Sequence, residues 1–583
     1  MTIARELITG QRYVAEMLHR YGVSHVFFVP TILTPALAVM GELGITRVTT
    51  HGEKAAAYMA DGYARAAHKP GVCMAQTVGA ANLAAGLKDA WLAGSPVLAL
   101  SGGSSPRTRY RHAYQELRDD FAAFAEVTKF SARVETTERL TDLLRQAFRA
   151  ATTGAPGPIH LELSGEQGFA ANETTALDVI AEERFAQVPA FRPAADAADV
   201  SAAVEALRAA DRPVMVVGGG VSTSGAQAQV VALSERAGIP FVSSLNGKSG
   251  LVSDHPLYLG VVGTYSRSCA NKLVLEADLV FFIGSHTGGQ VTAGWKVPPP
   301  GMPVIQLDID PLELGHNYPN RVSLLGDART VLRQMLDRLG GPSGNGRAGS
   351  SGDGHAAWLQ RARDLLSEWR SATSAMVRSD AVPMRPERVV AELSSALPDD
   401  AIVVVDTGHS GMWTGQQLEL RSPRQMFLRA AGSLGWGFPA ALGAKCAFPD
   451  RPVVCFTGDG GFFYHATELE TAARYGINAV IVVNNNFSLN QDERPFNAAY
   501  GGQQHEGFEM WQFSRETDFV KLAESLGCMG IRVEQPSEIQ PSLKRALAAN
   551  RPVVVDVLTD IKAMAPRAWT GAVEAPLRPG TGY

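Results

Sequence analysis

The sequence is poor in cysteine and in long apolar runs, and each shortage argues against a class of protein. Five cysteines occur in 583 residues and none lies in a CxxC pair, which argues against a disulfide framework and a cysteine-rich metal site. We therefore expect reduced thiols and a cytoplasmic protein. No apolar run approaches the ~18 residues that a membrane-spanning helix needs. The first 23 residues also lack the apolar region of a signal peptide.

Clustered charge is equally scarce. The formal net charge is -5, and Lys and Arg are spread along the chain instead of forming runs. A nucleic acid or an anionic membrane surface is therefore not an expected partner. We expect small molecules instead.

The sequence does contain a repeated alternation of short apolar strands with alanine-rich helical segments, over a length that suits three or four domains. Continuous apolar runs such as "PVMVV" and "NAVIVV" are typical of strands buried on both faces of a parallel sheet. We predict the α/β class with three doubly wound parallel-sheet domains. The predicted domains are 1–175, 190–340 and 385–560, with a Gly/Ser-rich linker and connecting helix at 341–384 and an irregular tail at 561–583.

The stretch "GDGGFFYHATELETAARYGINAVIVVNNN" is a strand end, a helix and a second strand with polar groups at both ends. In a right-handed strand-helix-strand unit both parallel strands finish at one edge of the sheet, so Asp459 and Asn486 are expected to meet there. A carboxylate oxygen, an amide oxygen and the backbone carbonyl of Ser488 are hard ligands suited to Mg²⁺, whose coordination a diphosphate would complete.

Three glycines surround Asp459. Gly458, Gly460 and Gly461 would let the backbone approach phosphate groups closely, and the following helix would contribute its N–H dipoles. Taken separately, the GDG and NNN runs are ordinary turns and loops.

At this spacing the two runs resemble the GDG…N signature of thiamine-diphosphate enzymes. The resemblance implies an N-terminal pyrimidine-binding domain, a central domain and a C-terminal diphosphate-binding domain, with thiamine diphosphate and Mg²⁺ as cofactors. The segment "THGEKAAAYMADGYAR" resembles the family's pyrimidine-binding segment and puts Glu53 in the place of the glutamate that hydrogen-bonds N1′ of the cofactor.

Three further segments carry the same resemblance. "AAGSLGWGFPAALGAK" implies that Leu434 supports the two cofactor rings from below, with Ser433 beside it. "DTGHSGMW" resembles the loop that cradles the diphosphate, with Gly408, His409 and Ser410 as donors. "YQELRDDFAAFAEVTKFSARV" implies that Gln115 lies near the cofactor.

The resemblance covers almost the whole chain and is to the acetolactate synthase, pyruvate oxidase and 2-hydroxyacyl-CoA lyase group. It implies a lyase or transferase that makes or breaks a C–C bond next to a carbonyl, with a 2-oxo acid as substrate. An alternative is cleavage of a 2-hydroxyacyl-CoA. "VGAAN" (Val78 to Asn82) and "GSHTGGQ" (Gly284 to Gln290) depart from the family patterns, and no two histidines are neighbours, which disfavours a simple pyruvate decarboxylase.

FAD or ADP in the central domain is an option that we do not favour, because "GSHTGGQ" lacks arginines. The resemblance also implies a homo-oligomer, at least a dimer and commonly a tetramer, in which Glu53 and Asp459 of one chain serve different sites.

Two interpretations from other classes stay open at this point. One is a nicotinamide dehydrogenase, for which "VVGGGVSTSG" would be the cofactor loop, but this run is only loosely Gly-rich and lacks a clean GxGxxG. A non-catalytic, nucleotide-binding paralogue would not be expected to retain Glu53, Asp459 and Asn486.

Overall fold

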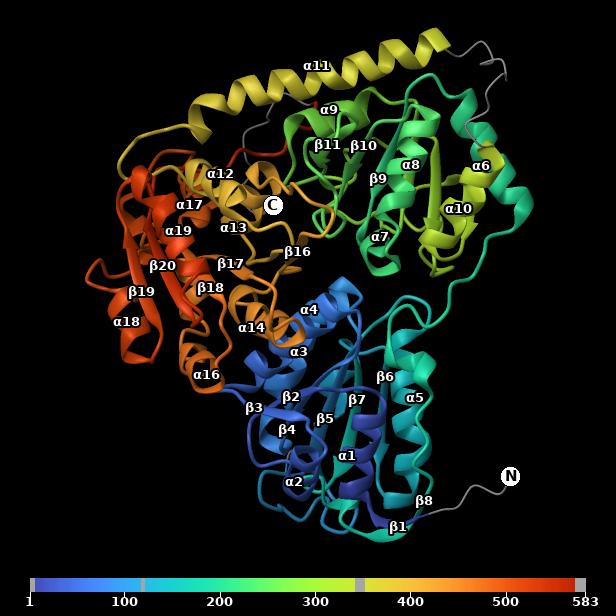
Figure 1. Cartoon of the computed structure of the whole chain (residues 1–583), viewed down its shortest axis with the longest axis vertical. Coiled ribbons are helices and arrows are strands. Elements are labelled where there is room, and N and C mark those ends of the chain that lie inside the picture. The colour runs from blue at the N-terminus through green and yellow to red at the C-terminus, as the bar shows by residue number, and fades with distance from the viewer. Residues whose placement is uncertain (1–5, 117–120, 341–351, 572–583) are drawn as a thin grey trace.

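The computed structural model describes residues 6–116, 121–340 and 352–571, and three six-stranded parallel sheets dominate it (Figure 1). Helices cover both faces of each sheet, and central strands such as β9 (Pro213–Val217) are buried along their whole length. Apolar side chains on both faces of a strand require this double cover. The predicted α/β class with three doubly wound parallel-sheet domains is confirmed.

The first sheet has the order β3-β2-β4-β5-β7-β6, with every neighbouring pair parallel. Its strands are β2 (His25–Phe28), β3 (Thr46–Thr49), β4 (Gly71–Ala75), β5 (Val97–Gly103), β6 (Phe130–Val134) and β7 (Ile159–Ser164). Its helices are α1 (Gly10–Arg20), α2 (Thr34–Glu42), α3 (Glu53–Ala67), α4 (Ala80–Ala93) and α5 (Leu140–Thr152).

The second sheet has the order β11-β10-β9-β12-β13-β14. Besides β9, its strands are β10 (Phe241–Ser243), β11 (Tyr258–Val261), β12 (Leu279–Ile283), β13 (Val304–Asp308) and β14 (Asn320–Leu325). Its helices are α6 (Ala197–Ala209), α7 (Gly219–Ser224), α8 (Gln227–Ala237), α9 (Ser268–Glu276) and α10 (Ala328–Leu339).

The third sheet has the order β16-β15-β17-β18-β20-β19. Its strands are β15 (Ile402–Val405), β16 (Met426–Arg429), β17 (Val453–Gly458), β18 (Val480–Asn485), β19 (Met529–Val533) and β20 (Val553–Leu558). Its helices are α12 (Pro386–Ala396), α13 (His409–Gln417), α14 (Gly437–Ala447), α15 (Asp459–Phe463), α16 (Glu468–Tyr475), α17 (Glu493–Ala499), α18 (Phe519–Ser525) and α19 (Ile539–Leu547).

A small antiparallel pair lies outside these sheets. β1 (Glu6–Thr9) pairs with β8 (Thr174–Leu177), which crosses the proposed boundary at residue 175. Leu177 and Phe185 are buried in the same core as β2 and α1, so the chain leaves the N-terminal domain later than residue 175.

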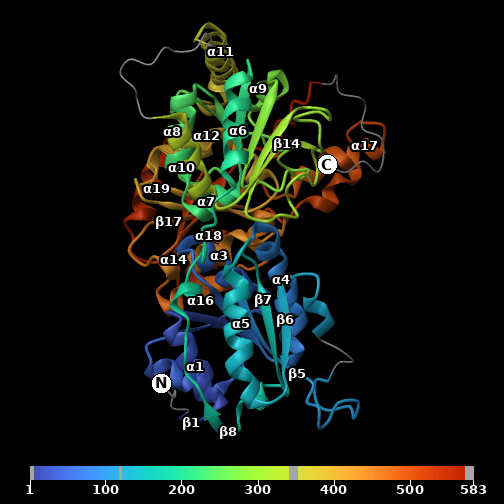
Figure 2. The same ribbon diagram turned by 90° about the vertical axis from the view of Figure 1, so that its right-hand side faces the viewer.

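The N-terminal and C-terminal domains meet where α3 crosses α14 (Figures 1 and 2). The two backbones approach so closely that a Cβ on Gly62 would overlap the carbonyl oxygen of Ala440, and a Cβ on Gly443 would overlap that of Met59. Only glycine fits at these two positions. The contact therefore fixes the helix that begins at Glu53 against the C-terminal domain.

Helix α11 (Gly352–Val377) lies across the central domain toward the C-terminal domain (Figure 1). Trp358 and Trp369 of this helix are buried, and Trp358 Nε1 donates to Pro213 O at 2.9 Å. Helix α11 lies within the range 341–384, for which we predict a linker and a connecting helix, and the glycine-rich stretch 341–351 lies outside the described residues.

The predicted tail is described as far as residue 571, and 572–583 lies outside the described residues. Its first part passes over the C-terminal domain, where Ile561 O and Ala563 O accept hydrogen bonds from Asn490 Nδ2. Asn271 of α9 donates to Trp569 O at 2.9 Å, so the tail also reaches the central domain.

The five cysteines are all buried and free. Across the described ranges, no helix combines the length and the apolar character that crossing a bilayer requires.

Candidate active site

Asp459 and Asn486 meet at the carboxyl edge of the third sheet, as the strand-helix-strand pattern predicts. β17 and β18 are parallel neighbours, and Asp459 is the first residue of α15. One carboxylate oxygen, Oδ2, accepts from the backbone N–H of Asn486 at 3.1 Å and of Ser488 at 3.0 Å. The other, Oδ1, accepts from Gly460 N at 2.7 Å.

The surroundings of Asp459 suit a cation. The side chain is buried, and burial raises the pKa of its carboxyl to about 7. Among the described residues, no basic side chain forms an ion pair with it. Asn486 Oδ1 is also buried, and it has no hydrogen-bond partner in the part of the chain that the structure describes. An uncompensated carboxylate beside an unpartnered amide oxygen is the arrangement that a hard cation would satisfy.

The donor set also narrows the type of metal. Within the described ranges, no three His, Cys, Asp or Glu side chains gather as metal ligands. One carboxylate with neutral oxygens is too weak for an all-protein Ca²⁺ or transition-metal site. It fits Mg²⁺, which takes few protein ligands and completes its coordination with phosphate oxygens and water.

The glycines around Asp459 serve two purposes. A Cβ on Gly460 would overlap the side chain of Leu489, and one on Gly461 would press against Thr457 and Asp406. These two glycines are therefore already required by internal packing. Gly458 has open space, because a Cβ there would meet Ser410 Oγ as its nearest atom, at 3.7 Å. Its backbone is thus accessible to a ligand.

The start of α13 faces this glycine. Gly408 precedes the helix with a φ of 67°, a left-handed conformation that glycine adopts without strain. His409 Nδ1 lies 2.9 Å from Asn490 Oδ1. Because Asn490 Nδ2 donates to two tail carbonyls, its Oδ1 must face the ring, so Nδ1 of His409 carries the proton.

This hydrogen bond limits what His409 can do. Burial lowers the pKa of His409 to about 4, so the ring is neutral at pH 7 and its other nitrogen, Nε2, is an acceptor. His409 can therefore donate from Nε2 to a phosphate only after taking up a proton. Gly408 N, Ser410 N and Ser410 Oγ remain as donors that need no such change.

Glu53 begins α3, on the N-terminal domain. Its Oε2 accepts from Asn82 Nδ2 at 3.2 Å, and its carboxyl packs on Gly79. The strand end that leads to it is held by α16, because His51 N donates to the buried Glu468 at 3.0 Å. The "VGAAN" segment therefore supplies the immediate neighbours of Glu53, with Asn82 as a partner that motif reasoning did not single out.

Gln115 lies on the loop after β5, with a φ of 61°. Its side-chain oxygen is buried and, within the described residues, has no hydrogen-bond partner. The hydrogen bonds of the described chain connect neither Glu53 nor Gln115 to Asp459. The structure thus brings Asp459 and Asn486 together on the C-terminal domain, whereas Glu53 and Gln115 lie on the N-terminal domain.

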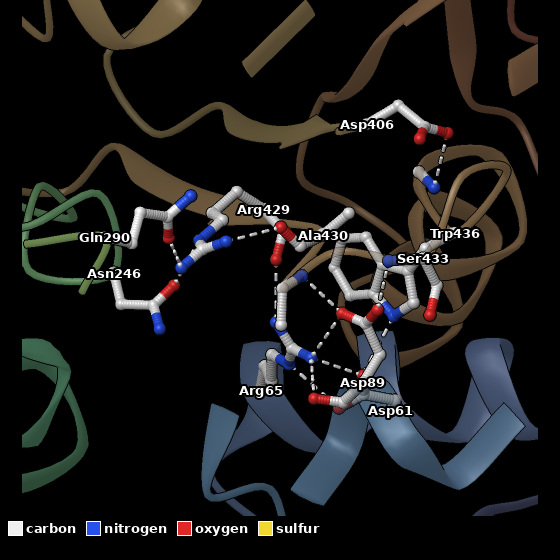
Figure 3. Close-up of polar contacts among 12 residues, drawn as sticks. Asp61, Arg65, Asp89, Asn246, Gln290, Asp406, Arg429, Ala430, Ser433 and Trp436 are labelled. Atoms are coloured by element: carbon white, nitrogen blue, oxygen red, sulfur yellow. Dashed lines mark hydrogen bonds and ion pairs between the residues drawn. The ribbon is translucent and has the colours of Figure 1, made fainter. Parts of the chain in front are cut away.

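Ser433 and Leu434 lie in the loop between β16 and α14, and Figure 3 shows Ser433 there. Gly435 N and Gly437 N both donate to Asp406, at 3.1 and 3.0 Å. Leu434 is half-buried instead of being a core side chain, so it is available to a ligand. Asp406 also packs on Gly461, and it thereby joins this loop to the GDGG segment.

Asp406 is a second residue that sequence reasoning did not assign. It opens the "DTGHSGMW" segment, and burial raises its pKa to about 6. The sequence signal that could have indicated Asp406 is an acidic residue directly after an apolar strand and before a glycine.

A cavity of about 390 Å³ lies between the central domain and the other two. Glycines that follow β9, β12 and β14 line it, and its ionisable lining residues are His286, Asp308, Asp327 and Arg429. Our expectation that the central domain holds no tightly bound FAD stays a prediction, and so does the alternative of ADP.

Comparison with known families matches all three domains. The thiamine pyrophosphate enzyme N-terminal TPP binding domain matches residues 8–123, the central domain 200–335, and the C-terminal TPP binding domain 406–557. Thiamine pyrophosphate is another name for thiamine diphosphate. The C-terminal match begins at Asp406 and contains Asp459 and Asn486.

Whole proteins are similar over nearly the full chain. The "Probable acetolactate synthase large subunit" of Methanocaldococcus jannaschii is 32% identical over 94% of this chain and 92% of its own length. The "Acetolactate synthase" of Arthrospira platensis is 31% identical, over 94% of each chain. "Acetolactate synthase isozyme 3 large subunit" of Escherichia coli is 30% identical over 95% of each. The three domains and these relatives together place the chain in the thiamine pyrophosphate enzyme family, in the group that contains the acetolactate synthases.

Proposed function

We propose that the protein is a Mg²⁺-dependent acetolactate synthase-like enzyme that joins two 2-oxo acid units with loss of CO₂. The observation that carries the proposal is the buried pair of Asp459 and Asn486, in which one carboxylate lacks a counter-cation and one amide oxygen lacks a partner among the described residues. The names of the relatives support the reaction type.

The C-terminal domain would hold the charged end of the cofactor. Asp459, Asn486 and the carbonyl of Ser488 would bind Mg²⁺, which would in turn bind the diphosphate. Gly408 and Ser410, at the start of α13, would donate to the phosphate oxygens. The open backbone at Gly458 would let a phosphate approach.

The other end of the cofactor would meet Glu53. Bound thiamine diphosphate supplies the electron sink that lets a bond next to a carbonyl break. Glu53 would hold and return a proton at N1′ of the pyrimidine, while Leu434 and Ser433 would support the rings. Asn82 would keep the Glu53 carboxyl oriented through its 3.2 Å hydrogen bond.

Glu53 and Asp459 would serve two different sites of a homodimer. In one chain their carboxyl groups are on separate domains and share no hydrogen bond with each other in the described residues. Exposed apolar side chains lie beside both, with Val78 next to the glycine that contacts Glu53 and Tyr464 just after α15. A second copy of the chain would cover these side chains, and pairs of dimers would give a tetramer.

A 2-oxo acid as substrate is the finer part of the proposal. Gln115, Asn490 and Gln491 are the polar candidates for contact with it. The Asn490 side chain already bonds His409 and two tail carbonyls, which favours Gln115 and Gln491. Cleavage of a 2-hydroxyacyl-CoA is the alternative. The test is to incubate the purified protein with thiamine diphosphate, Mg²⁺ and a panel of 2-oxo acids and 2-hydroxyacyl-CoA compounds. We expect CO₂ and acetolactate from pyruvate. Aldehyde release from the thioesters alone would instead favour the lyase.

A further inference from the structure

A buried carboxylate of the N-terminal domain holds the loop that carries Ser433 and Leu434. Asp89 lies on α4, and its side chain is fully buried. Its Oδ2 accepts from Ser433 N at 2.9 Å, and its Oδ1 accepts from Ala431 N (Figure 3). Two N–H groups of the loop are therefore bound by one side chain from another domain.

Arg65 of α3 supports this contact by binding Asp61 and Asp89. It forms a forked pair with Asp61, at 2.8 and 2.5 Å, and its Nη2 lies 3.5 Å from Asp89 Oδ1. The same guanidinium donates to Arg429 O at 2.8 Å, immediately before the loop. It also lies over the ring of Trp436, whose Nε1 donates to Asp61 at 2.8 Å.

The central domain holds the other side of the loop through Arg429. The Arg429 guanidinium donates to Asn246 Oδ1 at 2.8 Å, to Gln290 Oε1 at 2.5 Å and to Ala430 O at 2.8 Å. In Figure 3 the Arg65 guanidinium points to the backbone carbonyl of Arg429, and the Arg429 guanidinium points to Asn246 and Gln290. Residues 429–433, which belong to the C-terminal domain and precede Leu434, are thus held by both the N-terminal and the central domain.

The charges explain why the arrangement is rigid. Asp61 and Asp89 are both fully buried, and Arg65 is the cation between them. Hydrogen bonds from N–H groups to a buried carboxylate are about twice as strong as neutral ones, and breaking a buried pair leaves an uncompensated charge. The loop therefore cannot move without cost unless Asp89 moves with it.

We propose that Asp89 is a positioning residue for the cofactor, with Arg65 and Asp61 as its support. It fixes the backbone at Ala431 and Ser433, and so sets where Leu434 meets the cofactor rings. This role rests on the proposed function only in that Leu434 contacts the cofactor. The hold on the loop itself is independent of any ligand.

The first experiment is hydrogen–deuterium exchange of the cofactor-free protein, resolved to single amides between residues 430 and 437. In Asp89→Asn one end of the side chain is an NH₂ group, so at least one of the Ala431 and Ser433 amides loses its acceptor. We expect that amide to exchange about 10- to 100-fold faster, the change that loss of a charge-assisted hydrogen bond gives. The Gly435 and Gly437 amides, which Asp406 holds, should keep their rates and act as the internal control.

Two more variants separate this role from general damage. Arg65→Lys keeps the buried positive charge but loses the fork, so it should fold and show a smaller increase at the same two amides. Glu387→Gln removes a similarly buried carboxylate on α12, where Glu387 pairs with Arg385, and should leave the loop unchanged. If neither Asp89→Asn nor Arg65→Lys speeds exchange at Ala431 or Ser433, the proposal is wrong.

The second readout is C2 hydrogen exchange of thiamine diphosphate bound at saturation. In Asp89→Asn this rate should fall at least about tenfold, while the dissociation constant changes less than about threefold, because the metal and phosphate contacts lie elsewhere. An unchanged C2 rate with a loosened loop would overturn the positioning role. A wild-type protein that binds no thiamine diphosphate would instead refute the proposed function, and the amide exchange would still decide whether Asp89 holds the loop.

Discussion

The backbone amide of Asn486 donates to the carboxylate of Asp459 at 3.1 Å, although 27 positions separate them in the sequence. The contact exists because β17 and β18 are parallel neighbours that end at one edge of the sheet. It brings a buried carboxylate next to an amide oxygen that has no partner within the described residues. A site of this kind is costly when empty of cations and favourable when one binds.

Asp459→Asn should therefore remove cofactor binding without unfolding the protein. In the wild type, thiamine diphosphate with Mg²⁺ should raise the melting temperature, because a ligand that binds only the folded state stabilises it. In the variant this rise should vanish. Thermal denaturation with and without both ligands measures it.

The matched control is Glu387→Gln, which also neutralises a buried carboxylate but lies on α12. It should retain the ligand-dependent rise. An Asp459→Asn protein that showed the full rise would mean that the metal binds elsewhere.

Lys248 of the central domain should support the diphosphate loop from a distance. Its buried Nζ donates to three carbonyls near the C-terminal end of α13, those of Thr414, Gly415 and Leu418. Burial lowers the pKa of Lys248 well below its usual range, whereas three carbonyl acceptors around Nζ favour the ammonium form, which complements the helix dipole. The opposite end of α13 carries Gly408 and Ser410. Lys248→Met should cost about 2–4 kcal/mol of stability, since it leaves buried carbonyls unpaired.

Chemical denaturation checks this loss. Lys445→Met is the control, because Lys445 Nζ contacts a single carbonyl, that of Arg451, at a half-buried position. Equal stability losses in the two variants would contradict a special role for Lys248.

The close crossing of α3 and α14 predicts a steric effect. Gly443→Ala places a methyl group onto the carbonyl of Met59, so the helices must separate. We expect a loss of at least about 1–3 kcal/mol, the usual cost of overpacking. Calorimetric melting would show this loss. The control must be a glycine that an alanine can replace without strain, which excludes Gly476 because its φ is 63°. Gly432→Ala, where a Cβ would meet no atom within 4 Å, is the appropriate one.

His160 predicts a pH dependence of the N-terminal domain. Burial lowers the pKa of its ring to about 3, and both nitrogens face serine hydroxyls, of Ser101 at 2.8 Å and Ser131 at 2.9 Å. Because the unfolded ring binds a proton near pH 6.5, stability should fall as the pH drops from about 6.5 toward 3, by roughly 4 kcal/mol in total.

Urea denaturation at a series of pH values measures this slope. In His160→Asn the free energy of unfolding should depend less on pH over that range, although the substitution lowers stability at neutral pH. If the wild type and His160→Asn lost stability in parallel between pH 6.5 and 4, the ring would not be the group that titrates.

Local patterns were sufficient to predict the sheets and the Asp459 edge. Apolar runs such as Val480–Val483 are typical of strands buried on both faces, and this run is indeed β18. Gly476 ends α16 with a φ of 63°, as a C-terminal stop should. The meeting of Asp459 with Asn486 followed from the handedness of one crossover unit.

Contacts between domains could not be predicted in this way. Asp89 is an acidic residue in an alanine-rich helix, and nothing in its neighbourhood along the chain shows that Ser433, 344 positions later, donates to it. The α3–α14 crossing likewise depends on two glycines in different domains. The proton on His409 depends on the tail carbonyls that orient Asn490, a relation that no local pattern contains.

The most direct test of the account is the C2 hydrogen exchange of thiamine diphosphate bound to Glu53→Gln, with the dissociation constant measured by calorimetry in the same buffer. Glutamine keeps the size of Glu53 and can still bond Asn82, but it cannot exchange a proton with N1′ of the pyrimidine. We predict that the cofactor binds with nearly unchanged affinity, while C2 exchange slows by roughly 10²- to 10⁴-fold, as for the loss of a general acid–base group. Exchange as fast as in the wild type would show that another group activates the cofactor.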